Sequence, residues 1–170
     1  MSSGETTPWC GGSIITSRHI LTAAHCAFDK YTGDFKVPSS IQVVVGEHNT
    51  ADSIGEVFSV VAIRKYPLFD YENGDYDIAM LVLSTPITFS STAAPICLPA
   101  STQSQYSGQT ATVTGWGDTS LDGPSSPTLQ EVDVTVVDCS SYGSDEKELV
   151  SSVFYCIFLI FYMFQVSYLC

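Results

Sequence analysis

Short β-rich segments separated by turn residues are the feature that most limits how this 170-residue chain can fold. The segments are rich in Val, Ile, Thr and aromatic residues, and Gly, Pro, Asn or Asp interrupts them. Helical periodicity is nearly absent. Many short strands with frequent turns favour an all-β sandwich or barrel over alternating strands and helices. The predicted strands cover residues 12–15, 19–22, 41–45, 57–63, 78–83, 111–116 and 129–137.

Length and charge narrow the class of protein further. A chain of 170 residues can form one domain with a real core, but all-β proteins built from two barrels commonly need about 200–250 residues. The chain carries 18 acidic and 6 basic residues, which gives a formal net charge of −12. A strongly acidic protein is a poor partner for nucleic acid and for anionic membrane surfaces.

The six cysteines indicate disulfide bonds and an oxidising compartment. Buried free thiols in a cytosolic protein remain the alternative. No Cys-x-x-Cys pair occurs, so the cysteine spacing does not indicate a zinc site. The segment from Met1 to Trp9 lacks the basic start and apolar region of a signal peptide, so we expect the true start of a secreted protein to lie upstream.

The composition changes sharply after the acidic stretch Asp145-Glu146-Lys147-Glu148. From Leu149 to Cys170 no residue is charged. A run of about 20 apolar residues is long enough to cross a bilayer as a helix. Periodicity alone does not separate a membrane span from a buried segment.

Several sequence blocks, taken in order, resemble the trypsin-like (chymotrypsin-fold) serine endopeptidases between Trp9 and Tyr142. The blocks are Cys10-Gly11-Gly12-Ser13, Ala23-Ala24-His25-Cys26, Asp77-Ile78-Ala79-Met80, Pro95-Ile96-Cys97-Leu98-Pro99, Val113-Thr114-Gly115-Trp116-Gly117 and Leu129-Gln130-Glu131-Val132. The resemblance implies an all-β, chymotrypsin-like fold, with a first six-stranded barrel nearly complete and a second barrel only begun. It assigns residues 9–142 to a partial protease domain and residues 143–170 to a non-homologous acidic stretch plus apolar tail.

The resemblance implies catalytic roles for His25 and Asp77. Histidine is the usual general base for a hydroxyl nucleophile because imidazole titrates near neutral pH. In the family, a carboxylate holds the other ring nitrogen, and Asp77 fits because it opens an apolar strand, whereas the acidic residues before it resemble a solvated loop. A bond between Cys10 and Cys26 would tie the histidine loop to the preceding strand, as it does in the family.

The nucleophile block of this family, Gly-Asp-Ser-Gly-Gly, does not occur in the sequence. The serines of the later segments, at positions 120, 125, 126, 140 and 141, lack the glycine-flanked turn that such a nucleophile needs. We therefore predict a truncated or mis-assembled serine endopeptidase that is inactive as written. The alternative is a non-catalytic pseudoprotease or binding protein, which residues 149–170 would tether to a membrane if that tail is genuine.

The remaining expectations also come from the resemblance. The disulfide partners of Cys97 and Cys139 are expected to lie in segments that the sequence does not include. Some members bind calcium in the loop where this chain has Glu47, Asn49 and Glu56, although a plain solvated acidic loop is the favoured interpretation. No cofactor is required. The intact enzyme would act on polypeptide substrates outside the cell.

Overall fold

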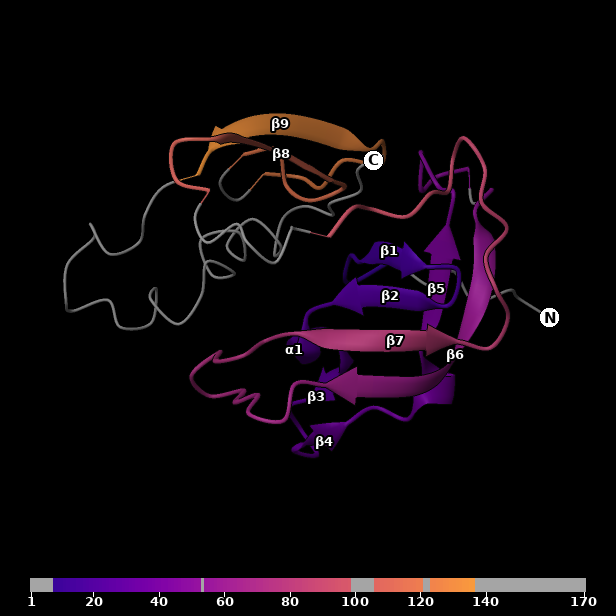
Figure 1. Ribbon diagram of the computed structural model, residues 1–170, viewed down its shortest axis with the longest axis vertical. Helices are drawn as coiled ribbons and strands as arrows, with labels where there is room; N and C mark the ends of the chain where they lie inside the picture. The colour runs from indigo at the N-terminus through magenta and orange to yellow at the C-terminus, as the bar shows by residue number, and fades with distance from the viewer. Residues whose placement is uncertain (1–7, 53, 99–105, 121–122, 137–170) are drawn as a thin grey trace.

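The computed structural model describes residues 8–52, 54–98, 106–120 and 123–136. Its main element is a curled five-stranded sheet, in which every neighbouring pair of strands is antiparallel (Figure 1). In order across the sheet, the strands are β1 (Ser13–Thr16), β2 (His19–Thr22), β7 (Ala79–Leu83), β6 (Glu56–Lys65) and β5 (Gln42–Val45).

The long strand β6 explains why the sheet curls. Its first half pairs with β5, from Glu56 opposite Val45 to Ser59 opposite Gln42. Its second half pairs with β7, and the register shifts between Val60 and Ala62. A bulge of this kind bends a strand and increases its twist, so the two ends of β6 can serve different partners.

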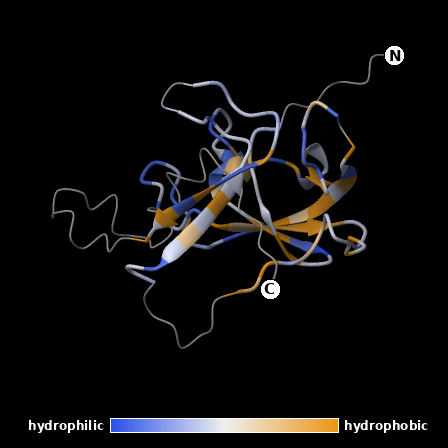
Figure 2. Cartoon of the chain, turned by 90° about the horizontal axis from the view of Figure 1, so that it is seen from above, coloured by the Kyte–Doolittle hydropathy of each residue, from blue (hydrophilic) through white to orange (hydrophobic). Residues whose placement is uncertain are grey.

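Alternating side chains on the strands fill the core. Strand β7 buries Ala79, Leu81 and Leu83 and leaves the residues between them partly exposed, which is the period of two expected for a half-buried strand. Phe58 and Val60 of β6 point to the same interior. In Figure 2 the strands carry most of the hydrophobic residues, and the loops that join them are mostly hydrophilic or intermediate.

Four short elements lie between β2 and β5, and the strand pattern did not predict them. They are α1 (Ala24–Ala27), β3 (Phe28–Asp29), β4 (Asp34–Phe35) and the 3₁₀ turn η1 (Pro38–Ser40). Strands β3 and β4 form a small hairpin, with Gly33 at a φ of 74° in its turn. Glycine adopts this left-handed conformation without a steric penalty.

A second unit begins with β8 (Thr110–Gly115) and β9 (Gln130–Thr135), which pair along their whole length. This hairpin forms a sheet of its own and is drawn above the five-stranded sheet in Figure 1. One of its attachments to the loop after β5 is the carbonyl oxygen of His48. That oxygen accepts hydrogen bonds from the Leu129 amide at 2.9 Å and the Trp116 indole at 3.0 Å.

The observed elements confirm the prediction of a partial all-β, chymotrypsin-like fold, since each predicted strand overlaps a strand of the structure. The sheet of the first unit has five strands where the resemblance implied a nearly complete barrel of six. Within the described ranges, no helix is long and apolar enough to cross a membrane. The predicted tail at residues 149–170, the acidic stretch before it, and Cys139, Ser140, Ser141, Cys156 and Cys170 lie outside the described residues.

Candidate active site

The single turn α1 places His25 at the end of β2. The chain leaves β2 through Ala23, which is extended, and then forms one helical turn. Ala23, Ala24 and Ala27 are only 3%, 0% and 1% exposed. Small side chains are needed here because a larger group would displace packed neighbours.

Sheet register brings Asp77 to the same place from the other side. Strands β2 and β7 are neighbours, and Thr22 lies opposite Ala79. The segment that follows Thr22 and the segment that precedes Ala79 therefore meet at one edge of the sheet. This pairing unites His25 and Asp77 although 52 positions separate them in the sequence.

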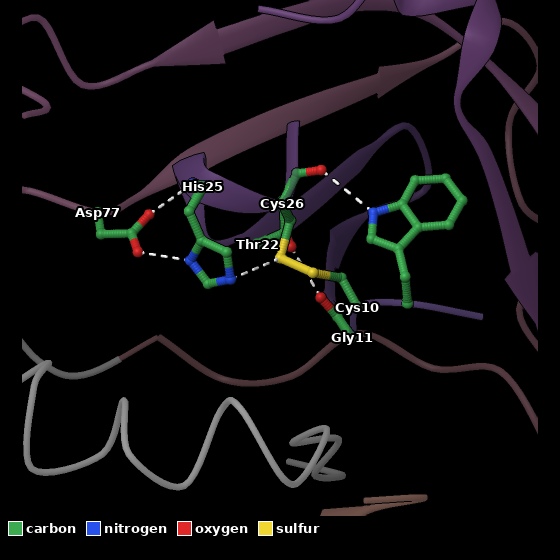
Figure 3. Close-up of a disulfide and its surroundings, with 7 residues drawn as sticks. Cys10, Gly11, Thr22, His25, Cys26 and Asp77 are labelled. Atoms are coloured by element: carbon green, nitrogen blue, oxygen red, sulfur yellow. Dashed lines mark hydrogen bonds and ion pairs between the residues drawn. A yellow bond between two sulfur atoms is a disulfide. The ribbon is translucent and has the colours of Figure 1, made fainter. Parts of the chain in front are cut away.

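The Asp77 carboxylate contacts His25 at two points (Figure 3). Oδ1 accepts a hydrogen bond from the His25 backbone N–H at 2.7 Å, and Oδ2 lies 2.6 Å from the ring Nδ1. The Asp77 side chain is 9% exposed and that of His25 is 23% exposed. Because an ionised carboxylate only accepts hydrogen bonds, this contact assigns the ring proton to Nδ1 and the lone pair to Nε2.

The backbone before Asp77 is held in an uncommon conformation. Tyr76 has a φ of 52°, and its carbonyl accepts a hydrogen bond from the Ile78 amide at 2.7 Å. The Tyr76 ring stacks on Tyr66 with centroids 5.0 Å apart. Aromatic stacking is worth about 0.5–1.5 kcal/mol, which offsets part of the cost of a left-handed non-glycine residue. The tight turn aims the Asp77 carboxylate at α1.

The Cys10–Cys26 disulfide lies on the other side of the imidazole (Figure 3). It joins the segment before β1 to α1, where the resemblance placed it. Cys26 Sγ is 3.5 Å from His25 Nε2. The Thr22 hydroxyl donates a hydrogen bond to the Gly11 carbonyl at 2.7 Å, and the Trp9 indole donates one to the Cys26 carbonyl at 3.2 Å.

Trp9 and Tyr76 are support residues that the sequence analysis did not identify. Gly12 is a third, because a Cβ atom there would lie 2.8 Å from Ile20 Cγ2 and 2.9 Å from the Leu21 carbonyl oxygen. Nothing in the block Cys10-Gly11-Gly12-Ser13 shows which glycine the packing requires. The sequence around Trp9 gives equally little indication of its contact, because the indole bonds to the carbonyl of Cys26, 17 positions away.

Four aromatic rings pack beside the site and define an aromatic cluster: Phe28, Phe35, Phe69 and Tyr71. Phe28 follows α1 directly and stacks on Tyr71 at 4.7 Å between centroids. Residues of this cluster line a shallow hollow of about 540 Å³. The cluster joins the β3–β4 hairpin to the segment that leads to Asp77.

The expected calcium ligands are distributed along one loop. Glu47 Oε1 accepts hydrogen bonds from the backbone amides of His48 and Asn49, and Oε2 accepts one from Gly55. Asn49 Oδ1 accepts a hydrogen bond from the Ala51 amide, and Glu56 begins β6. The Glu47 carboxylate thus closes the loop on itself, and calcium binding there stays the less favoured of the two interpretations.

One expectation about the cysteines is wrong. Cys97 is disulfide-bonded, although its partner was expected in a segment that the sequence does not include. Cys10 and Cys26 bond to each other. The resemblance identified positions that take part in disulfides but did not give the partner of Cys97 in this chain.

Comparison with known proteins agrees with this geometry. The Trypsin family model matches residues 1–159. The chain is 39% identical to Trypsin-1 of Astacus astacus over 84% of this chain and 61% of the relative, and 37% identical to Trypsin of Simulium vittatum over 76% and 49%. It is also 34% identical to Proclotting enzyme of Tachypleus tridentatus over 75% of this chain.

The chain spans 61%, 49% and 36% of the lengths of those three relatives, respectively. The family match nevertheless covers most of the chain, and the described sheet, the histidine loop and the aspartate turn all lie within it. The chain belongs to the trypsin family of serine proteases.

Proposed function

We propose that this chain supplies the general base and its orienting carboxylate to a serine-type endopeptidase. The observation that carries the proposal is the two-point contact of Asp77 with His25, through the backbone N–H at 2.7 Å and Nδ1 at 2.6 Å. A contact to the backbone as well as the ring fixes both where the imidazole stands and which way it faces. This preorganisation suits proton transfer.

The chemistry follows from the protonation pattern of the imidazole. His25 Nε2 would take the proton of a serine hydroxyl while the oxygen attacks a peptide carbonyl. Asp77 would stabilise the resulting imidazolium through Nδ1–H. The imidazolium would then give its proton to the leaving amine, and a water molecule would repeat the cycle on the acyl-enzyme.

Three further parts of the proposal concern the catalytic serine, the substrate and the cellular compartment. The sequence contains no Gly-Asp-Ser-Gly-Gly block, so the 170 residues are proposed to be inactive on their own. The substrates would be polypeptides, as for proteases of the family. An extracellular location is supported by the disulfides, because such bonds persist in oxidising compartments.

The first test treats the purified 170-residue chain with a fluorophosphonate probe. No serine should be labelled, because the sequence contains no Gly-Asp-Ser-Gly-Gly block to supply an activated hydroxyl. The second test joins residues 1–136 to the segment of a trypsin that contains Gly-Asp-Ser-Gly-Gly. That chimera should be labelled and should hydrolyse a peptide substrate.

His25 is the discriminating residue in the chimera. His25→Ala should lower kcat by about 10⁶, the loss seen when a triad histidine is removed. The control His48→Ala changes an exposed histidine of the loop after β5, and it should keep kcat within about twofold. Stoichiometric labelling of the 170-residue chain would contradict its proposed inactivity. A folded chimera without activity would support the non-catalytic alternative.

A further inference from the structure

Cys10, His25 and Cys26 bring two sulfur atoms and one ring nitrogen within 4.8 Å of one another. These atoms belong to the disulfide and to the candidate base, and Figure 3 shows them on one side of α1. We propose that reduction of the Cys10–Cys26 bond converts this group into a binding site for Zn²⁺. The site would have two thiolates and one imidazole as protein ligands.

The nitrogen and one sulfur already have the separation that zinc requires. Zn–S bonds of about 2.3 Å and Zn–N bonds of about 2.0–2.1 Å at a tetrahedral angle place the two ligand atoms about 3.5 Å apart. In the structure His25 Nε2 and Cys26 Sγ are 3.5 Å apart. A zinc ion could therefore bridge these two atoms without a change in the position of α1.

The second sulfur has to move away from the first. Two thiolates on one tetrahedral zinc ion stand about 3.8 Å apart, which is far beyond bonding distance. Cys26 is held within α1, whereas Cys10 is exposed and precedes β1. We therefore expect the Cys10 side chain and its exposed segment to move, while Cys26 stays in place.

Asp77 would orient the imidazole for the metal. Histidines that bind zinc usually donate their other ring N–H to a carboxylate, which fixes the tautomer and makes the ligand nitrogen more basic. Asp77 Oδ2 holds Nδ1 at 2.6 Å, so Nε2 presents its lone pair towards Cys26. His25 is 23% exposed, which leaves a route for water to the fourth position of the metal.

The reaction is balanced with a phosphine as reductant. The phosphine and one water molecule reduce the S–S bond to two thiols, and the phosphine becomes its oxide. Zn²⁺ then displaces one proton from each thiol. A bound ion would occupy the Nε2 lone pair, so the reduced, zinc-loaded form could not use His25 as a base. Only this last consequence depends on the proposed function.

The test is a metal titration of the whole chain after phosphine reduction, with Co²⁺ as the spectroscopic probe and Zn²⁺ as competitor. We expect a thiolate-to-cobalt charge-transfer band with tetrahedral visible bands, and Zn²⁺ should abolish both. The oxidised chain should show neither band. An oxidised chain that binds Co²⁺ equally well would overturn the proposal.

Variants separate this site from the other cysteines. Cys10→Ser/Cys26→Ser keeps Cys97 and the remaining thiols and should lose one equivalent of bound cobalt. His25→Ala should also lose it, whereas His48→Ala should not. Unchanged cobalt binding in Cys10→Ser/Cys26→Ser or in His25→Ala would overturn the proposal.

Asp77→Asn tests whether the reduced chain binds metal in its folded form. Loss of such a carboxylate partner typically lowers metal affinity by 10–100-fold. An unfolded chain would not respond, because Asp77 is 52 positions from His25. An affinity unchanged by Asp77→Asn would therefore overturn the proposal. Metal binding is measured without substrate, so this result and the hydrolysis result of the chimera can fail separately.

Discussion

Asp77 binds a single residue through both of its oxygens, and the two bonds have different consequences. The bond to the His25 backbone N–H fixes the position of α1, while the bond to Nδ1 fixes the tautomer of the ring. Tyr76, with its φ of 52°, turns the carboxylate towards these donors. A single acidic side chain thus determines both the place and the protonation pattern of the imidazole.

Asp77→Asn separates these two consequences. The amide oxygen can still accept the bond from the His25 backbone N–H, but the amide nitrogen then faces Nδ1 as a donor. We expect the ring to change from the Nδ1–H to the Nε2–H tautomer, which nitrogen NMR of labelled histidine detects. In the active chimera, the same change should lower kcat by about 10⁴. An unchanged tautomer would contradict this account of Asp77.

The residues that meet here could be proposed from the sequence, but not all of their contacts. Motif blocks gave His25, Asp77 and the two cysteines because the residue types and their order are distinctive. The backbone bond of Asp77, the conformation of Tyr76 and the indole bond of Trp9 each depend on atoms distant in the sequence. No local pattern carries that information.

At the level of elements, the acidic loop after β5 is closed by one side chain. Glu47 accepts backbone hydrogen bonds from His48, Asn49 and Gly55. These amides would lose their partner in Glu47→Ala, and an unsatisfied group costs about 1–3 kcal/mol when it is shielded from water. The loop needs this carboxylate in order to keep its shape.

We expect Glu47→Ala to lower the free energy of unfolding by about 1–3 kcal/mol, measured by urea denaturation. Glu72→Ala is the matched control, because Glu72 is an exposed acidic residue of another loop, and its effect should stay below about 0.5 kcal/mol. A chelator should leave the melting temperature of the wild-type chain unchanged. A drop in melting temperature would show instead that the loop binds calcium.

The strands were predictable to different degrees. A run of β-branched residues marked β5, partial alternation marked β6, and an apolar run marked β7. The two-residue strands β3 and β4 and the single turn α1 are too short to show a period. Packing of Phe28 and Phe35 in the aromatic cluster stabilises the β3–β4 hairpin, and sequence patterns do not display such tertiary contacts.

For the whole molecule, the contacts between the sheet and the β8–β9 hairpin include those of the loop after β5, where Asn49 forms an isolated β-bridge with Thr128. Trp116 and Leu129 donate to the His48 carbonyl, and the Thr50 amide donates to the Pro127 carbonyl at 2.8 Å. These bonds join two units whose strands do not pair with each other. The orientation of the hairpin should therefore be sensitive to each of them.

Trp116→Phe removes one indole donor from this junction. We expect the free energy of unfolding to fall by about 0.5–1.5 kcal/mol. Hydrogen exchange should become faster at the Leu129 and Thr50 amides and should change little in β7. Trp9→Phe removes the same chemical group at the disulfide and should leave those two amides protected. Faster exchange of Leu129 and Thr50 in Trp9→Phe would contradict a local role for Trp116.

The pairing of β2 with β7 also has a consequence for the order of folding. The pairs β1–β2, β5–β6 and β6–β7 each join strands that follow one another in the described chain, whereas β2–β7 closes a long loop. Loop closure of this length is entropically costly and slows folding. His25 and Asp77 meet where β2 pairs with β7, which is the pairing that we expect to form late. The imidazole and the carboxylate therefore come together only when the first sheet is complete.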